Sequence, residues 1–405
     1  MTSNRLRLNK KRWLTSTVFG IGMASFFSDL SHESVTSVLP ALLASMGVAA
    51  GALGTIEGVA DGLSSVAKLY GGWLADRLER RKPLCAFGYG VMALATGVIA
   101  AATVWPLLLV GRGLAWVARG LRTPARKALL AEAVTPQTYG RAFGFERTMD
   151  TLGAVIAPLA SLGLLGFGLF HRQVVWISVV PALLAVAAIV FLARETTDRK
   201  PSPHPFLASV RGLPKGFIRF LYGVGLFGAG DFAHSLMILY AVTVLTPKVG
   251  AANAATMSVG LYALHNVVYA GVSYPAGVLA DRMNKRLLLA LGYGLGATTA
   301  LLLALGINSL GALAVAFIAG GAYVGVEETL EDSLAAELLP GGLRGTGFGA
   351  MAVVNGMGDL VSSLCVGWLW ATVGPAAGFG FALALMSAGA GVVWAMRKNP
   401  TVASE

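Results

Sequence analysis

Ionisable residues lie inside two long apolar stretches of the sequence. Asp29, His32 and Glu33 occupy positions i, i+3 and i+4, a spacing that places side chains on one face of a helix. A second apolar stretch contains Asp231 and His234, again spaced Asp-x-x-His. Charged groups within the membrane are costly and mark functional positions by default. These residues are therefore the first candidates for a binding or proton-transfer site.

Three kinds of chemistry suit these residues. A histidine beside a carboxylate can take up and release a proton near neutral pH, which favours proton-coupled transport. Imidazole groups also bind transition metals, and the candidate ligands are His32, His234, Met237 and His265. Alternatively, the polar groups only join helices through hydrogen bonds. The Asp-x-x-His spacing in two separate stretches favours a functional role, because a hydrogen-bonded strut need not appear twice.

Further charges interrupt other apolar stretches. Glu57, Asp61 and Arg112 are added to the candidates for substrate binding or coupling, and Arg112 is expected to pair with one of the two carboxylates. Four more residues stand in pairs 205 positions apart with opposite charges: Arg122 with Glu327, and Arg126 with Glu331. We expect these pairs to form salt bridges that close the cytoplasmic side.

The composition indicates a membrane protein. Of the 405 residues, 56% are hydrophobic and only 13% are charged, against about 25% charged in a soluble domain. Twelve apolar runs are long enough to cross a bilayer, which takes roughly 20 residues. We place these runs near residues 15–46, 50–74, 84–103, 106–125, 146–169, 173–193, 217–246, 254–280, 287–307, 309–330, 346–372 and 375–396.

The basic charge follows the topology. The net charge is +11, but the Lys and Arg residues gather before the first run and in the breaks after every second run. This distribution is the positive-inside pattern, and it predicts that both termini are cytoplasmic. Because the charge is explained in this way, we expect no nucleic-acid partner. The protein is expected in the cell membrane, which is the inner membrane if the source is Gram-negative.

The chain is internally duplicated. Leu-Ala-Asp-Arg occurs at 74–77 and again at 279–282, 205 residues apart, each time after a glycine and before basic residues. Ala131-Glu132 and Phe143-Gly144 recur at the same offset. Self-similarity at a fixed offset indicates repeated structural units. We predict an N-terminal six-helix bundle over 1–195, a proline-rich cytoplasmic linker over 196–216 and a C-terminal bundle over 217–405.

The two Gly-x-Leu-Ala-Asp-Arg segments, the twelve apolar runs and the central loop resemble the major facilitator superfamily. Residues 72–81 match the family's loop motif except at Glu79, where the family has glycine. The resemblance implies an all-α membrane protein of two pseudo-symmetric six-helix bundles that transports by alternating access. It also implies that the motif's charges hold the cytoplasmic gate, and the matching residues are Asp76, Arg77, Arg81, Asp281 and Arg282.

The sequence contains no complete enzyme motif. His32-Glu33 lacks the second histidine of a zinc protease, and no phosphate-binding loop is present. The sequence thus predicts a monomeric, cofactor-free secondary transporter of a small molecule or ion, coupled to protons. A transition-metal transporter is the alternative within transport, and a non-transporting receptor or sensor is the alternative from another class.

Overall fold

The computed structural model describes residues 13–46, 50–195, 201–202 and 204–396, without the side chains of 44–45, 50–62 and 65. Over these residues the chain is helical and contains no strand. The N-terminal half comprises α1 (Ser16–Ser45), α2 (Ala50–Arg77), α3 (Lys82–Ala101), α4 (Trp105–Glu132), α5 (Tyr139–Gly166) and α6 (His171–Ala187). A short π-helical turn, Ala188–Leu192, extends α6.

The C-terminal half follows a short helix, α7 (Phe206–Arg211), which lies within the predicted linker. Its helices are α8 (Lys215–Gly228), α9 (His234–Val249), α10 (Ala251–Ala280), α11 (Lys285–Ala304), α12 (Leu310–Leu338), α13 (Arg344–Thr372) and α14 (Pro375–Ala395). Among the described residues, seven helical segments are by themselves long and apolar enough to span a membrane. The all-α membrane fold is confirmed, and the predicted count of twelve spans fits it.

The seventh predicted span is broken rather than continuous. Residues 229–233 leave the helix between α8 and α9, and this break contains Asp231. Gly228 and Gly230 lower the helical propensity there. Ser363 Oγ accepts a hydrogen bond from the Ala233 amide, 3.2 Å away, and the buried Phe232 ring packs on Phe379. Irregular backbone at this depth is tolerated where it is buried in protein or lines a cavity.

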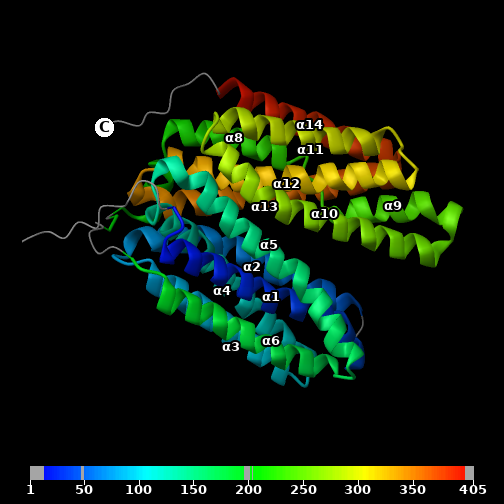
Figure 1. Ribbon diagram of the computed structural model, residues 1–405, viewed down its shortest axis with the longest axis horizontal. Coiled ribbons are helices and arrows are strands. Elements are labelled where there is room, and N and C mark those ends of the chain that lie inside the picture. Colours follow the sequence, from blue (N-terminus) through cyan, green and yellow to red (C-terminus); the bar gives the residue numbers. More distant parts are fainter. Residues whose placement is uncertain (1–12, 47–49, 196–200, 203, 397–405) are drawn as a thin grey trace, which may run out of the picture.

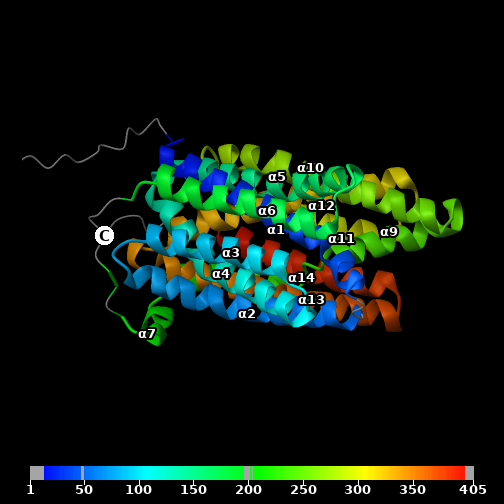
Figure 2. The same ribbon diagram turned by 90° about the horizontal axis from the view of Figure 1, so that it is seen from below.

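The two halves meet at one end of the molecule. We call this the linker end, because α7 lies there (Figure 2). The main packing between the halves is α5 against α10 and α2 against α13. Figure 1 shows the helices of the two halves diverging toward the opposite end, where the tips of α9 and α10 project.

Close packing at the linker end depends on glycine. A Cβ atom on Gly72 would lie 2.2 Å from the carbonyl oxygen of Gly345, and one on Gly140 would lie 2.2 Å from that of Gly277. Each pair therefore holds two helix backbones in direct contact, as small residues do between membrane helices. Gly72 and Gly277 are 205 residues apart, as are Gly140 and Gly345, so the two contacts are copies of each other.

Candidate functional site

Asp76 and Asp281 of the repeated motif bind helix N-termini in the opposite half. Asp76 accepts hydrogen bonds from the amides of Gly345 and Thr346, at 2.9 and 2.7 Å, where α13 begins. Asp281 accepts from the amides of Gly140 and Arg141, at 2.8 and 3.1 Å, where α5 begins. The first amides of a helix lack partners within the helix and carry partial positive charge, so a carboxylate satisfies both needs.

Two arginines complete this interface. Arg81 is fully buried, pairs with Asp76 at 2.6 Å and with Glu132, and donates to the carbonyl of Gly341 in the other half. On the symmetric side, Arg141 pairs with Asp281 at 2.7 Å. By contrast, Arg77 and Arg282 are exposed, and Arg77 lies over the Trp73 ring. Of the predicted gate residues in the motif, the aspartates and Arg81 therefore make the interface.

Residues related by the duplication also contact each other near the linker end. Lys127 and Asp332 form an ion pair of 2.6 Å, and Arg344 donates to the Tyr139 hydroxyl. The rings of Phe143 and Phe348 are 5.9 Å apart. Each of these pairs is separated by 205 residues. A residue meets its own copy only near a two-fold axis, so this region is the pseudo-symmetry axis of the protein.

The predicted pairs Arg122–Glu327 and Arg126–Glu331 do not form in this structure. Arg126 instead pairs with Glu146 at 2.8 Å and Asp150 at 3.5 Å within its own half. Glu331 accepts hydrogen bonds from Tyr293 and Asn355. Lys127, the next residue after Arg126 and about 100° further around the helix, faces the other half and makes the bridge. The predicted salt bridge between Arg126 and Glu331 was therefore wrong by one residue in each half, because Lys127 and Asp332 form it instead.

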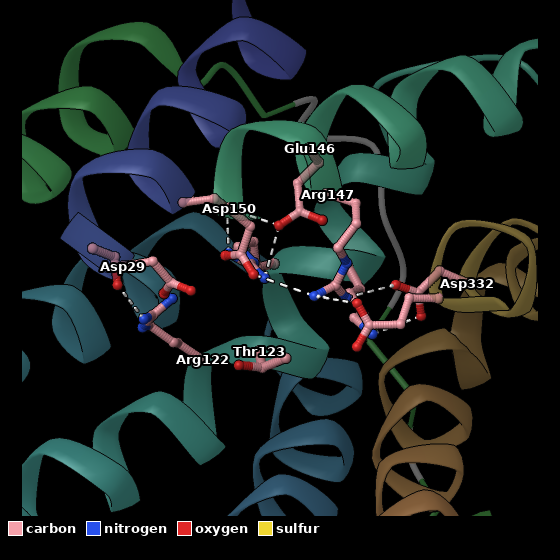
Figure 3. Close-up of polar contacts among 12 residues, drawn as sticks. Asp29, Arg122, Thr123, Glu146, Arg147, Asp150 and Asp332 are labelled. Atoms are coloured by element: carbon pink, nitrogen blue, oxygen red, sulfur yellow. Dashed lines mark hydrogen bonds and ion pairs between the residues drawn. The ribbon is translucent and has the colours of Figure 1, made fainter. Parts of the chain in front are cut away.

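A charged cluster on α5 was missed from the sequence. Glu146 and Arg147 are adjacent on this helix and Asp150 lies one turn further on, and Arg147 points toward Asp332 of the other half (Figure 3). Arg147 pairs with Glu328 at 3.0 Å and approaches Asp332 at 3.7 Å. We predicted the span to begin at 146, and so placed these charges at its end. In fact α5 begins at Tyr139, and the cluster lies about two turns inside it.

A cavity of about 490 Å³ lies between the halves. This volume falls within the roughly 300–1,000 Å³ of small-molecule sites. The charges lining it are distributed unequally. The N-terminal half contributes six cations and two carboxylates, which are Lys68, Arg119, Arg122, Arg126, Lys127, Arg147, Asp29 and Asp150. The C-terminal half contributes four carboxylates and, among the described lining residues, no Lys or Arg; they are Asp231, Glu327, Glu328 and Asp359.

The first-helix candidates are brought together only in part. Asp29 lines the cavity and holds both guanidinium nitrogens of Arg119, at 3.2 and 3.3 Å. His32 is buried, edge-on to the Trp116 ring, and Glu33 is half-buried. Arg112 donates to Thr36 Oγ1 at 2.9 Å. The side chains of its predicted partners, Glu57 and Asp61, lie outside the described residues.

In the C-terminal half the Asp-x-x-His residues do not share a helix face. Asp231 lies in the break between α8 and α9 and accepts a hydrogen bond of 2.7 Å from the Tyr323 hydroxyl. His234 begins α9 and meets the His265 ring edge-on, with ring centroids 4.6 Å apart. These two histidines and Tyr262 form a small cluster of rings. The expectation of one continuous helical face was wrong because the helix breaks at Gly230.

The metal hypothesis gains no support from the geometry. His32 packs in the N-terminal half, whereas His234, Met237 and His265 lie in the other, where the methyl group of Met237 and the ring of His265 both approach Gly320. Over the described residues, no three His, Cys, Asp or Glu side chains gather as a metal site requires. The predicted ligand set is therefore divided between the halves.

A model of the Major Facilitator Superfamily matches residues 21–362. The chain belongs to the major facilitator superfamily. It is 28% identical over 367 residues to an uncharacterised MFS-type transporter of Methanocaldococcus jannaschii, and the alignment covers 89% of each chain. It is 24% identical over 382 residues to an uncharacterised protein of Mycobacterium tuberculosis, with 88% of this chain covered.

Solved superfamily structures share the fold. The transporter FucP, in its outward conformation, superposes with a TM-score of 0.76 at 15% identity, covering 95% of this chain and 99% of that one. The human organic anion transporter MFSD10 gives a TM-score of 0.68 at 15% identity, covering 93% and 99%. Membership of the superfamily makes the protein a membrane transporter.

Proposed function

We propose that this protein is a proton-coupled secondary transporter that works by alternating access, with Asp231 as the principal proton-binding residue. The linker end faces the cytoplasm, as the basic residues in the loops there indicate. Closure of that end by Asp76 and Asp281, together with divergence of the halves at the other end, corresponds to an outward-facing state. Breaking these contacts would open the cavity to the cytoplasm.

The environment of Asp231 carries the coupling proposal. This carboxylate lines the cavity, lies in the broken helix, and has one described hydrogen bond, from Tyr323. An ionised carboxylate without a cation is costly within the membrane, and a proton removes that cost. Asp29 differs because Arg119 neutralises it with two contacts. Of the candidates in the first helix of each half, Asp231 therefore fits a reversible proton site better than Asp29.

Uptake into proteoliposomes tests this proposal. A panel of labelled metabolites is offered with and without an inward proton gradient, and a hit is then assayed for exchange against internal unlabelled compound. Asp231→Asn is expected to abolish gradient-driven accumulation while retaining exchange, because a fixed neutral side chain binds substrate but releases no proton. Asp29→Asn, the matched control from the other half, is expected to retain a response to the gradient.

Three outcomes would contradict the proposal. Gradient-driven accumulation by Asp231→Asn equal to that of the unaltered protein would exclude Asp231 as the coupling residue. Uptake that ignores the gradient in the unaltered protein would exclude proton coupling altogether. Failure of every compound to cross, with binding retained, would favour the receptor alternative.

A further inference from the structure

Two buried charges of opposite sign line the cavity, and neither has a counter-ion among the described residues. Arg122 on α4 is 1% exposed, donates to Ser28 at 2.7 Å and lies over the Tyr89 ring, but no carboxylate lies within ion-pair distance among the described residues. Its Nε atom is buried without a hydrogen-bond partner. Glu327 on α12 is 7% exposed and has neither a hydrogen bond nor an ion pair with any described residue.

These two charges occupy equivalent positions in the two halves. Arg122 and Glu327 are 205 residues apart, so the pseudo-symmetry axis that relates Lys127 to Asp332 also relates them. Both line the same cavity, on opposite walls. Lys127 and Asp332 neutralise each other directly across the axis, whereas Arg122 and Glu327 remain separate, with the cavity between them.

The surrounding charges extend this polarity across the cavity. On the N-terminal wall, Asp29 forms an ion pair with Arg119, and Asp150 forms ion pairs with Arg126 and Arg147. Neither carboxylate of this wall therefore pairs with Arg122. On the C-terminal wall, Asp231 and Asp359 accompany Glu327, and that wall has no Lys or Arg among its described residues. The cation whose charge acts on Asp359 is Lys68 of the opposite wall. One wall is therefore anion-binding and the other cation-binding.

We propose that the cavity binds a dipolar substrate, a small molecule whose anionic group pairs with Arg122 and whose cationic group pairs with Glu327. An unpaired buried charge is strongly unfavourable, and a partner that supplies the opposite charge removes the penalty. A zwitterion supplies both at once, each to the wall that lacks it. Amino acids, small peptides and related amino carboxylates have this chemistry. This inference rests on the proposed transport function for its physiological meaning, but binding itself does not depend on it.

The test uses compounds that differ only in charge. Each of a set of amino acids and dipeptides is prepared in four forms: free, N-acetylated, C-amidated, and blocked at both ends. Binding to the purified full-length protein is measured from ligand-induced thermal stabilisation at a series of concentrations. We expect at least one zwitterion to bind, and expect blocking either charge to weaken its affinity by at least about tenfold.

Two variants assign the charges to the walls. With Glu327→Gln, the free compound is expected to bind no better than its N-acetylated form, because the partner of its amino group is gone. With Arg122→Gln, it is expected to bind no better than its C-amidated form. Arg122→Lys and Glu327→Asp keep the charges and should retain the preference for zwitterions. These two variants distinguish loss of a charge from loss of folding. Arg211→Gln, on the exposed linker helix, is the matched control and should change nothing.

Several results would overturn the inference. One is that no zwitterion in the panel stabilises the protein; another is that a singly charged form binds as tightly as its zwitterion. Equal weakening of all four forms by both variants would indicate that Arg122 and Glu327 act only in the fold. Transport and binding fail separately: a zwitterion that binds but is not accumulated in proteoliposomes supports this inference and contradicts the proposed function.

Discussion

The two halves are alike at the linker end and unlike in the cavity. At the linker end, Asp76 and Asp281 repeat each other's contacts with the opposite half. Around the cavity, Glu146 and Asp150 of the N-terminal half are paired with Arg126, whereas Glu331 of the C-terminal half accepts hydrogen bonds from Tyr293 and Asn355. In the mechanism that we propose, both halves take part in one motion, and the interface that moves is symmetric. The ligand that we propose is asymmetric, and the two copies differ around the cavity that would bind it.

The largest expected effect concerns the ion pairs of the N-terminal half. Arg126→Gln leaves two buried carboxylates, Glu146 and Asp150, without their main cation. Removing one partner of a buried ion pair costs about 3–5 kcal/mol. We expect a large fall in the free energy of unfolding, measured by denaturant titration in detergent. Arg126→Lys should recover part of it, and a variant as stable as the parent would show that these pairs do not support the fold.

The glycine contacts test the symmetric part of the comparison. Gly140→Ala places a methyl group 2.2 Å from the backbone oxygen of Gly277, and overpacking of this kind costs about 1–3 kcal/mol. The linker end should separate, as measured by electron–electron distances between spin labels at the exposed positions Arg80 and Met283 in a background without Cys85 and Cys365. Gly163→Ala in the same helix meets no atom within 4 Å and should leave the distances unchanged.

The gate aspartates test how far that symmetry extends. Asp76→Asn and Asp281→Asn each remove a charge from a helix N-terminus, an interaction that contributes about 0.3–2 kcal/mol. Asp76 also pairs with Arg81, whose side chain is fully buried, whereas the Arg141 side chain paired with Asp281 is 32% exposed. The same spin-label distances should therefore shift further toward the open state for Asp76→Asn. A larger shift for Asp281→Asn would mean that burial of the ion pair is not what holds the gate.

The sequence was sufficient to predict the fold and to select the two aspartates of the linker-end interface, but not the groups that they contact. A repeated tetrapeptide and a set of apolar runs predict duplicated helical bundles, because membrane spans have a fixed length and little polar content. The roles of Asp76 and Asp281 came from resemblance to the superfamily. The structure adds that each reaches a helix N-terminus of the other half.

Side-chain direction is what the sequence could not supply. Arg126 and Lys127 are adjacent in sequence, and only their rotation about α4 decides which one faces Asp332. The break at Gly230 was also missed, since a glycine in an apolar run is compatible with a continuous span. Glu146, Arg147 and Asp150 were overlooked because they were placed at the end of the predicted span. Their i, i+1, i+4 spacing was visible, but their burial depends on how deeply α5 is set.

The smallest effect is expected at Glu331, the position equivalent to Arg126. Its two oxygens accept hydrogen bonds from the Tyr293 hydroxyl and the Asn355 amide. In Glu331→Gln the amide oxygen can still accept from Asn355, and the amide nitrogen can donate to Tyr293, because a phenolic hydroxyl both donates and accepts. The unfolding free energy should therefore change by less than about 1 kcal/mol. Glu331→Ala, which leaves both partners without an acceptor, should cost more. If Glu331→Gln destabilises the protein as much as Arg126→Gln does, the carboxylates of the C-terminal half also support the fold. The two halves would then differ in the sign of the charges around the cavity but not in what those charges do for stability.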